Sequence, residues 1–209
     1  EYALLMEMGC GKTKVLIDST SYLYDNGYLN GLLVVCPNGV KGTWINEINT
    51  HCPEHVEKNV VVWTGKKTKK HEDELQSLFI TEPAKVQLNV LIMNVDAFAT
   101  HRGKDFARRF LMTRQAMMTI DESTTIKNPS ALRTKSITKL GLIARYRVIM
   151  TGSPITKSPE DLYAQCNFLS PDLLGFSSIY TFKMRYCVMT RLSYGGRSFN
   201  KVIDYKNLD

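Results

Sequence analysis

The chain has 209 residues, of which 44% are hydrophobic and 22% charged, so it can bury one sizeable core and is expected to form one domain with appendages. No stretch reaches the roughly 18 to 20 apolar residues of a membrane span, and the N-terminus lacks a signal-peptide pattern, so we expect a soluble, intracellular protein without a membrane partner. Its 5 cysteines include no C-x-x-C pair, which argues against a disulfide framework and against a zinc ribbon.

Charge is distributed unevenly along the chain. Residues 1–101 hold 9 lysines, no arginine and 12 acidic residues, a net charge of −3, whereas residues 102–209 hold 18 basic and 8 acidic residues, a net charge of +10. A basic half favours a polyanionic partner such as nucleic acid, and a solvated basic surface is the alternative.

Short apolar runs alternate with helical patterns along most of the chain. The expected strands are residues 2–5, 32–36, 60–64, 90–94, 117–120 and 147–151. The expected helices are residues 12–26, 41–51, 71–81, 104–115, 130–143 and 159–169. Several strands are continuously apolar, as in sheets covered by helices on both faces, so we predict an α/β fold with a central, mostly parallel sheet. Beyond residue 171, residues 177–189 predict one more helix, and the remainder predicts a linker or hairpin leading out of the domain.

The first strand runs into the stretch "MEMGCGKT", residues 6–13, which we call the phosphate loop. Its two glycines let successive backbone N–H groups point at one centre, the following helix N-terminus attracts anions, and a lysine and a threonine suit phosphates and Mg²⁺. The candidate nucleotide-binding residues are Met8, Gly9, Cys10, Gly11, Lys12, Thr13 and Lys14. Met6 occupies the position of the first glycine in the common pattern, and an ordinary strand-to-helix turn is the alternative.

The stretch "AMMTIDEST" ends an apolar strand with the acidic pair Asp121 and Glu122. From the carboxyl end of a parallel strand, carboxylates can face a neighbouring phosphate loop. We expect Asp121 to hold Mg²⁺ together with Thr13, and Glu122 to orient or deprotonate the attacking water. The predicted catalytic residues are therefore Lys12, Asp121 and Glu122, and a solvated acidic pair is the alternative.

A third apolar strand ends in Thr151, Gly152 and Ser153, which we call the Thr-Gly-Ser turn. Its hydroxyls are placed to bond to the acidic pair and to couple its state to the rest of the molecule. The alternative is a small-residue turn before a helix.

At these motifs the sequence resembles the superfamily 2 helicase-like ATPases, and among them the Swi/Snf-type DNA translocases. The phosphate loop, with its non-glycine first position, and three further stretches carry the likeness: "LLVVCPNGVKGTWINEI", "TIDESTTIKNPSALRTKSITKL" and "VIMTGSPITKSPEDLYAQCNFLSP". The resemblance covers about residues 3–187. It implies a P-loop NTPase fold of the RecA-like kind, a three-layer sandwich that binds ATP and Mg²⁺.

Two departures limit what the resemblance implies. Ser123 and Thr124 replace the Ala-His that usually follows the acidic pair, so the coupling hydrogen bonds there must differ. No stretch matches the second ATPase lobe with its arginine motif, and the adenine-reading segment is missing. We therefore expect residues 1–170 to be the first lobe, residues 171–209 to lead to a second lobe of the same chain, and the isolated lobe to hydrolyse ATP poorly. The chain looks cut from a longer protein.

In this family, loops after the second strand and around the fourth contact the nucleic-acid backbone. Here those loops span residues 37–43 and 94–102, and they offer Lys41, Thr43, His101 and Arg102. The expected partner is DNA, duplex or single-stranded, or RNA, and plain solvated loops are the alternative. Trp44 is expected in the core.

The predicted function is the first motor lobe of an ATP-dependent DNA translocase or helicase. The alternatives are a motor lobe of a restriction system and a nucleotide-dependent clamp that does not translocate. A compact lobe with few insertions is more typical of a phage or bacterial member, which predicts a cytoplasmic location in a bacterium or an infected cell, or a nuclear one if the source is eukaryotic.

Overall fold

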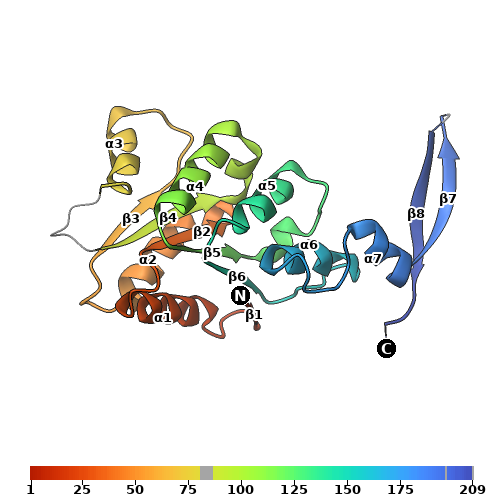
Figure 1. Cartoon of the computed structure of the whole chain (residues 1–209), viewed down its shortest axis with the longest axis horizontal. Coiled ribbons are helices and arrows are strands. Elements are labelled where there is room, and N and C mark those ends of the chain that lie inside the picture. Colours follow the sequence, from red (N-terminus) through yellow and green to blue (C-terminus); the bar gives the residue numbers. More distant parts are fainter. Residues whose placement is uncertain (81–86, 196, 209) are drawn as a thin grey trace.

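A computed structural model describes residues 1–80, 87–195 and 197–208 of the chain. Its centre is a six-stranded sheet in the order β1-β6-β5-β2-β4-β3, in which every neighbouring pair is parallel (Figure 1). The strands are β1 (Tyr2–Leu5), β2 (Gly31–Cys36), β3 (Lys58–Val62), β4 (Leu88–Asn94), β5 (Ala116–Asp121) and β6 (Tyr146–Thr151). The predicted parallel α/β sheet is confirmed.

Five helices connect successive strands of the sheet, and a sixth, α6, follows β6; together they form the two outer layers. They are α1 (Lys12–Asp25), α2 (Lys41–His51), α3 (Lys69–Ser77), α4 (His101–Thr113), α5 (Leu132–Gly141) and α6 (Glu160–Leu169). Three short 3₁₀ helices lie at the ends of strands or in the loops that follow them: η1 (Asn38–Val40), η2 (Val95–Ala99) and η3 (Ser123–Ile126). In Figure 1, α1 and α2 lie on one side of the sheet, while α3, α4 and α5 lie on the other.

The continuous apolar run of β2 explains the three layers. Leu32 and Val34 pack in one buried cluster with residues of α1 and α2, whereas Leu33 and Val35 pack in a second cluster with residues of α4, α5 and α6. Because successive side chains of a strand point to opposite faces, a strand covered on both faces must be apolar at every position. Several of the strand predictions, that of β2 among them, depended on this property.

Helix boundaries differ from the prediction by a few residues. Helix α4 begins at His101 instead of residue 104, because the hydroxyl of Thr100 accepts a hydrogen bond from the N–H of Gly103 at 3.1 Å and caps the first turn. Residue 81, the predicted end of the third helix, lies outside the described residues.

The C-terminal segment contains helix α7 (Ile179–Tyr186) and the antiparallel strands β7 (Cys187–Tyr194) and β8 (Arg197–Tyr205). The predicted helix over residues 177–189 therefore ends three residues early, and the hairpin alternative is confirmed. Helix α7 contacts α6 through Phe182 and Tyr163, whose ring centroids lie 5.6 Å apart. The role of this segment as a path to a second lobe stays a prediction. Among the described residues, no helix combines the length and apolarity needed to cross a membrane.

Candidate nucleotide site

Three sequence motifs meet at the carboxyl edge of the sheet. The phosphate loop follows β1, the acidic pair ends β5, and the Thr-Gly-Ser turn ends β6, which lies between those two strands. The register pairs Leu5 with Thr151 and Asp121 with Met150, so all three strands end at the same level. Segments more than 100 residues apart in sequence are therefore neighbours in space.

The phosphate loop has the backbone expected of an anion-binding turn. Gly9 and Gly11 have φ angles of 80° and 81°, a left-handed conformation that L-residues with side chains rarely adopt. Within the described chain, the N–H groups of Gly9, Gly11 and Lys12 donate to no protein group. Helix α1 has neither a side-chain cap nor an acidic residue in its first turn, so its positive end is uncompensated. The loop therefore fits phosphate oxygens.

Lys12 lies at the start of α1 with its ammonium group folded over the same loop. Its Nζ donates to the carbonyl oxygens of Met6 at 2.8 Å and Glu7 at 2.9 Å. The positive charge of Lys12 also acts on Asp121: burial raises the pKa of that carboxyl, and Lys12 is one of the groups that oppose the rise. The cation of the loop and the carboxylate of β5 thus lie near one another. The neighbouring Lys14 pairs with Asp18 at 2.5 Å on the exposed side of α1.

Asp121 is held by a tryptophan from a different layer. The indole Nε1 of Trp44, on α2, donates a hydrogen bond of 2.9 Å to Oδ2 of Asp121. Burial raises the pKa of Asp121 above its usual value, and the hydrogen bond from Trp44 is the largest opposing influence. The indole N–H therefore favours the ionised carboxylate that a metal ion requires.

Glu122 has a strained backbone and a fixed carboxylate. Its φ and ψ angles are 52° and 66°, the left-handed region, which is costly for a residue with a side chain. Its Oε1 accepts hydrogen bonds from the hydroxyls of Thr151 at 2.7 Å and Thr124 at 2.8 Å. No described group donates to Oε2, so this oxygen remains available to a water molecule.

The hydrogen bond from Thr151 links the Thr-Gly-Ser turn to the acidic pair, as the sequence led us to expect. The hydroxyl oxygen of Thr151 also accepts from the N–H of Ser153 at 3.2 Å. A Cβ atom on Gly152 would lie 3.5 Å from the carbonyl oxygen of Met6 and 3.6 Å from the N–H nitrogen of Met8, so the turn lies against the phosphate loop. The three motifs form one contiguous site, and the coupling role of the turn stays a prediction.

The two residues that depart from the family pattern have separate partners. Thr124 bonds to Glu122, as described above, whereas the buried Ser123 donates to Oε1 of Gln165 on α6 at 2.5 Å. Gln165 in turn donates to the carbonyl oxygens of Pro154 and Asp161, each at 2.7 Å. The Ser-Thr dipeptide thus connects the acidic pair to the segment that follows the Thr-Gly-Ser turn.

Asp161, at the start of α6, ties two of these loops together. It accepts hydrogen bonds from the N–H groups of Thr156 and Lys157, both at 2.9 Å, and from the hydroxyl of Thr156 at 2.7 Å. The ammonium of Lys127, which follows the acidic pair, lies 3.4 Å away. Although burial works against the charged form, these bonds lower the pKa of Asp161 to about 2.

The residues predicted to contact nucleic acid lie beyond the ends of the adjacent strands β2 and β4. Lys41 opens α2 half-buried, and Thr43, two residues later, is exposed. His101 pairs with Asp105 at 2.7 Å, and Arg102 pairs with Glu72 and lies 4.9 Å from the ring centre of Trp63. The guanidinium of Arg102 is thus already engaged within the protein. The nucleic-acid role of these four residues stays a prediction.

Sequence reasoning missed three polar contacts of the site. Trp44 is 2% exposed, so its predicted place in the core is confirmed, but its bond to Asp121 was not foreseen. A buried tryptophan usually donates its N–H to a nearby acceptor, and this general tendency was the signal from which the bond could have been predicted. Gln165 and Asp161 gave no comparable signal, because nothing in the sequence shows which loop they face.

Comparisons with known proteins agree with this geometry. A family model described as "SNF2-related domain" matches residues 3–201. The ISWI chromatin-remodeling complex ATPase CHR17 of Arabidopsis thaliana is 31% identical over 177 residues, which cover 84% of this chain and 15% of that protein. The Chromodomain-helicase-DNA-binding protein 1-like of Danio rerio is 28% identical over 181 residues, covering 86% of this chain and 16% of that protein.

Among solved structures, the SWI2/SNF2 ATPase core of Sulfolobus solfataricus in complex with dsDNA matches with a TM-score of 0.65 and 26% identity. The match covers 88% of this chain and 34% of that chain. The chain thus spans about a sixth of the two curated relatives and about a third of the solved core. Both curated relatives are eukaryotic, so the predicted phage or bacterial origin, and with it the cellular compartment, gains no support from them.

Proposed function

Because this chain belongs to the SNF2-related family of ATPases, we propose that it is the first lobe of a motor that hydrolyses ATP and moves along DNA. The observation that carries the proposal is the convergence at one sheet edge of an N–H-lined loop, Lys12, and the acidic pair. The matched proteins named above are a chromatin-remodelling ATPase, a protein named as a DNA-binding helicase, and an ATPase core in complex with DNA. Neither a restriction motor nor a static clamp gains support from these names.

The phosphate loop is the binding half of the proposed site. Its N–H groups and the ammonium of Lys12 bind the phosphates of ATP. The hydroxyl of Thr13 and the carboxylate of Asp121 would hold Mg²⁺, which prefers oxygen ligands and is commonly held by one or two protein groups together with phosphates. When bound, the metal ion neutralises charge on the phosphates. The hydrogen bond from Trp44 favours the ionised form of Asp121 and holds its Oδ2 in place for this task.

Glu122 is the chemical half of the proposed site. The hydroxyls of Thr124 and Thr151 fix its Oε1, so Oε2 is directed to the water that attacks the terminal phosphate and accepts its proton. Thr151 belongs to the Thr-Gly-Ser turn, which also lies against the phosphate loop. We therefore assign this turn the task of linking the state of the nucleotide to the loops that hold nucleic acid.

The remaining parts of the motor are proposed to lie outside this lobe. Charge that develops on the transferring phosphoryl group needs cations on more than one side, and an arginine finger is worth about 10³ to 10⁵ in rate. Lys12 serves one side of the site, and a second ATPase lobe would supply the other. DNA, bound through its phosphates at the loops after β2 and β4, is the proposed partner, and RNA is kept as a comparison in the test.

Two substitutions in the full-length protein separate binding from chemistry. Lys12→Ala should abolish nucleotide binding and turnover, whereas Glu122→Gln should retain nucleotide affinity while turnover falls by about 10² or more. Lys66→Ala, at an exposed lysine remote from the site, is the matched control. Wild-type turnover in Lys12→Ala, or loss of binding with an unchanged rate per bound nucleotide in Glu122→Gln, would contradict the assignment.

A further inference from the structure

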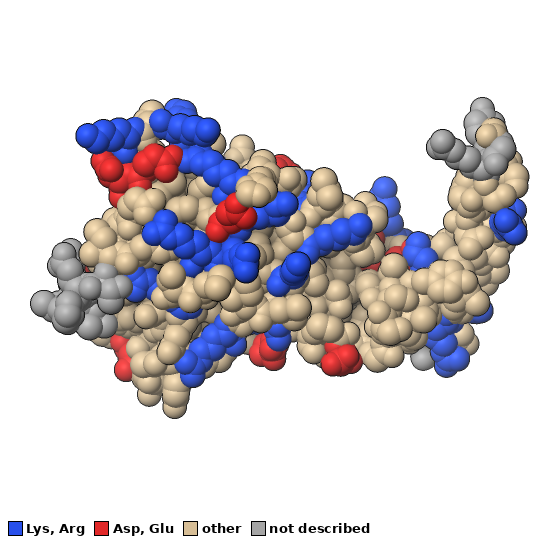
Figure 2. All heavy atoms as spheres, turned by 45° about the horizontal axis from the view of Figure 1, so that its top comes forward, with Lys and Arg blue, Asp and Glu red and all other residues tan. Residues whose placement is uncertain are grey.

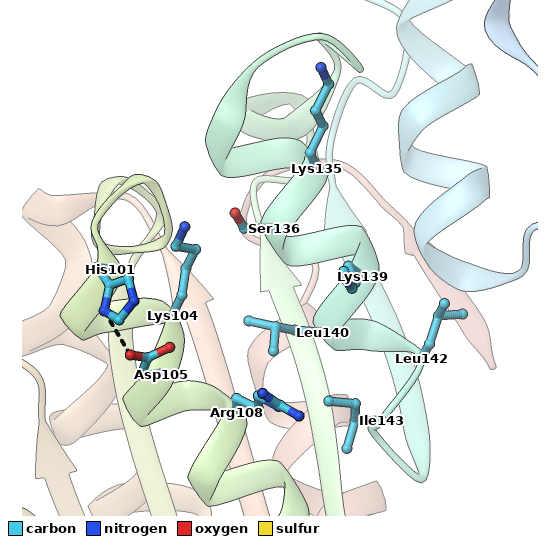
Figure 3. A pocket seen from close by; sticks show the side chains of 10 residues that line it. All are labelled: His101, Lys104, Asp105, Arg108, Lys135, Ser136, Lys139, Leu140, Leu142 and Ile143. Carbon is cyan, nitrogen blue, oxygen red and sulfur yellow. Dashed lines mark ion pairs between the residues drawn. The ribbon is translucent and has the colours of Figure 1, made fainter.

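A groove of about 600 Å³ lies between α4 and α5, on the helical layer opposite α1 and α2. Figure 3 shows side chains from both helices on its two walls, with Leu142 and Ile143 at the end remote from His101. The nucleotide site does not use this groove, since neither the phosphate loop nor the acidic pair lines it.

The walls of the groove carry an excess of positive charge. Lys104 and Arg108 come from α4, and Lys135 and Lys139 come from α5. None of these four cations forms an ion pair or a side-chain hydrogen bond with any described residue, and the one carboxylate of the lining, Asp105, is paired with His101 at 2.7 Å. Figure 2 shows Lys and Arg side chains spread over the face that carries these helices. The groove therefore attracts an anionic partner.

One end of the groove is apolar. Leu142 is 56% exposed and Ile143 is 38% exposed, and both directly follow α5. In Figure 3 the side chain of Arg108 reaches across toward Leu140 and Ile143. A partner that only neutralised charge would leave these aliphatic groups in water, whereas a partner with aliphatic side chains would bury them.

This combination distinguishes a peptide from a nucleic acid. Phosphate contacts need cations alone, and base recognition by stacking needs aromatic platforms, of which the lining has no Phe, Tyr or Trp. An acidic peptide offers carboxylates for Lys104, Lys135 and Lys139 together with aliphatic side chains for the apolar end. The groove runs between two packed helices, a shape into which side chains of a peptide can insert.

We propose that the groove between α4 and α5 binds an acidic segment of a partner protein, with its carboxylates against the four cations and its aliphatic side chains against Leu142 and Ile143. This surface lies apart from the nucleotide site, so the inference does not depend on the proposed ATPase activity.

The test measures binding of a labelled synthetic peptide of alternating Glu and Leu residues to the 209-residue chain by fluorescence anisotropy. The wild-type chain should bind it with a salt-dependent affinity. Lys135→Glu/Lys139→Glu should weaken binding by about tenfold or more, and Leu142→Ser/Ile143→Ser by about fivefold. Lys66→Glu/Lys67→Glu makes the same change in net charge away from the groove and should leave the affinity within about twofold of wild type.

Further probes distinguish the alternatives. A peptide with Ser in place of Leu should bind more weakly and should be insensitive to Leu142→Ser/Ile143→Ser. Circular dichroism and thermal unfolding verify that every variant is folded. The proposal is overturned if the Glu-Leu peptide does not bind at about 100 μM, or if the control variant weakens it as much as the groove variants do. It is also overturned if a single-stranded oligonucleotide depends on Lys135 and Lys139 while the peptide does not, because the groove would then be a nucleic-acid surface.

Discussion

Asp161→Asn removes the charge that joins the segment after the Thr-Gly-Ser turn to Lys127. Asp161 is 8% exposed, and although burial raises the pKa of its carboxyl, the hydrogen bonds from Thr156 and Lys157 outweigh that effect and lower the pKa from the ordinary 3.8 to about 2. A shift of this size corresponds to about 2 kcal/mol of differential stability between the ionised and protonated forms. We expect Asp161→Asn to lower the free energy of unfolding by about that amount at pH 7.

The sign of the shift fixes the pH dependence. A lowered pKa means that the unfolded state takes up the proton first, so the contribution of Asp161 is complete above the unfolded pKa and is lost as the pH falls through the folded one. The difference between wild type and Asp161→Asn should stay nearly constant from pH 7 to 5, fall to roughly half near pH 3, and continue toward zero at lower pH.

Urea unfolding followed by circular dichroism at several pH values measures this difference. Asp172→Asn serves as the control, because Asp172 is exposed and its carboxylate has no hydrogen-bond or ion-pair partner within the described chain. A difference that persists unchanged to pH 3, or one no larger than that of the control at pH 7, would refute the view that the charge of Asp161 joins the two loops.

Three further predictions concern the nucleotide site and its partner. Trp44→Phe removes the N–H that bonds to Asp121, so the affinity for Mg²⁺-nucleotide should fall about three- to tenfold, while the affinity for nucleotide in EDTA stays constant. A fluorescent-nucleotide titration in which the Mg²⁺ dependence is unchanged would contradict this prediction. Thr151→Val should lower turnover about tenfold while nucleotide affinity is retained. Thr151→Ser should turn over ATP at the wild-type rate, because it keeps the hydroxyl that donates to Glu122. Equal loss of turnover in both variants would show that this hydroxyl is unimportant. The logarithm of DNA affinity should fall linearly with the logarithm of salt concentration, by about 0.7 to 0.9 per phosphate contacted and with little sequence preference; an affinity that does not change with salt would count against backbone binding.

The sequence predicted the parts of the fold that depend on local pattern. Continuous apolar runs identified strands such as β2 because both faces of a central strand must be buried. Glycines followed by Lys-Thr identified the phosphate loop because few other turns need that backbone. The start of α4 was missed, although Thr100 is of a residue type preferred at helix N-caps and was the available signal.

Contacts between distant elements could not be predicted in the same way. The bond between Trp44 and Asp121 joins residues 77 positions apart, and it forms because the side chain of Trp44 on α2 reaches the end of β5. The Ser123–Gln165 bond depends likewise on where α6 returns to the sheet. A single sequence shows that such side chains are polar or aromatic, but their partners are decided by helix packing.

The most direct test of the central claim is ATP turnover, measured for the full-length protein and for residues 1–209 alone, with duplex DNA, single-stranded DNA, RNA or no nucleic acid. The account predicts that DNA raises turnover of the full-length protein by orders of magnitude, while the isolated lobe remains slow under every condition because it lacks cations from a second lobe. If the isolated lobe reached the DNA-stimulated rate of the full-length protein, or if the full-length protein ignored nucleic acid, the two-lobe motor account would be contradicted.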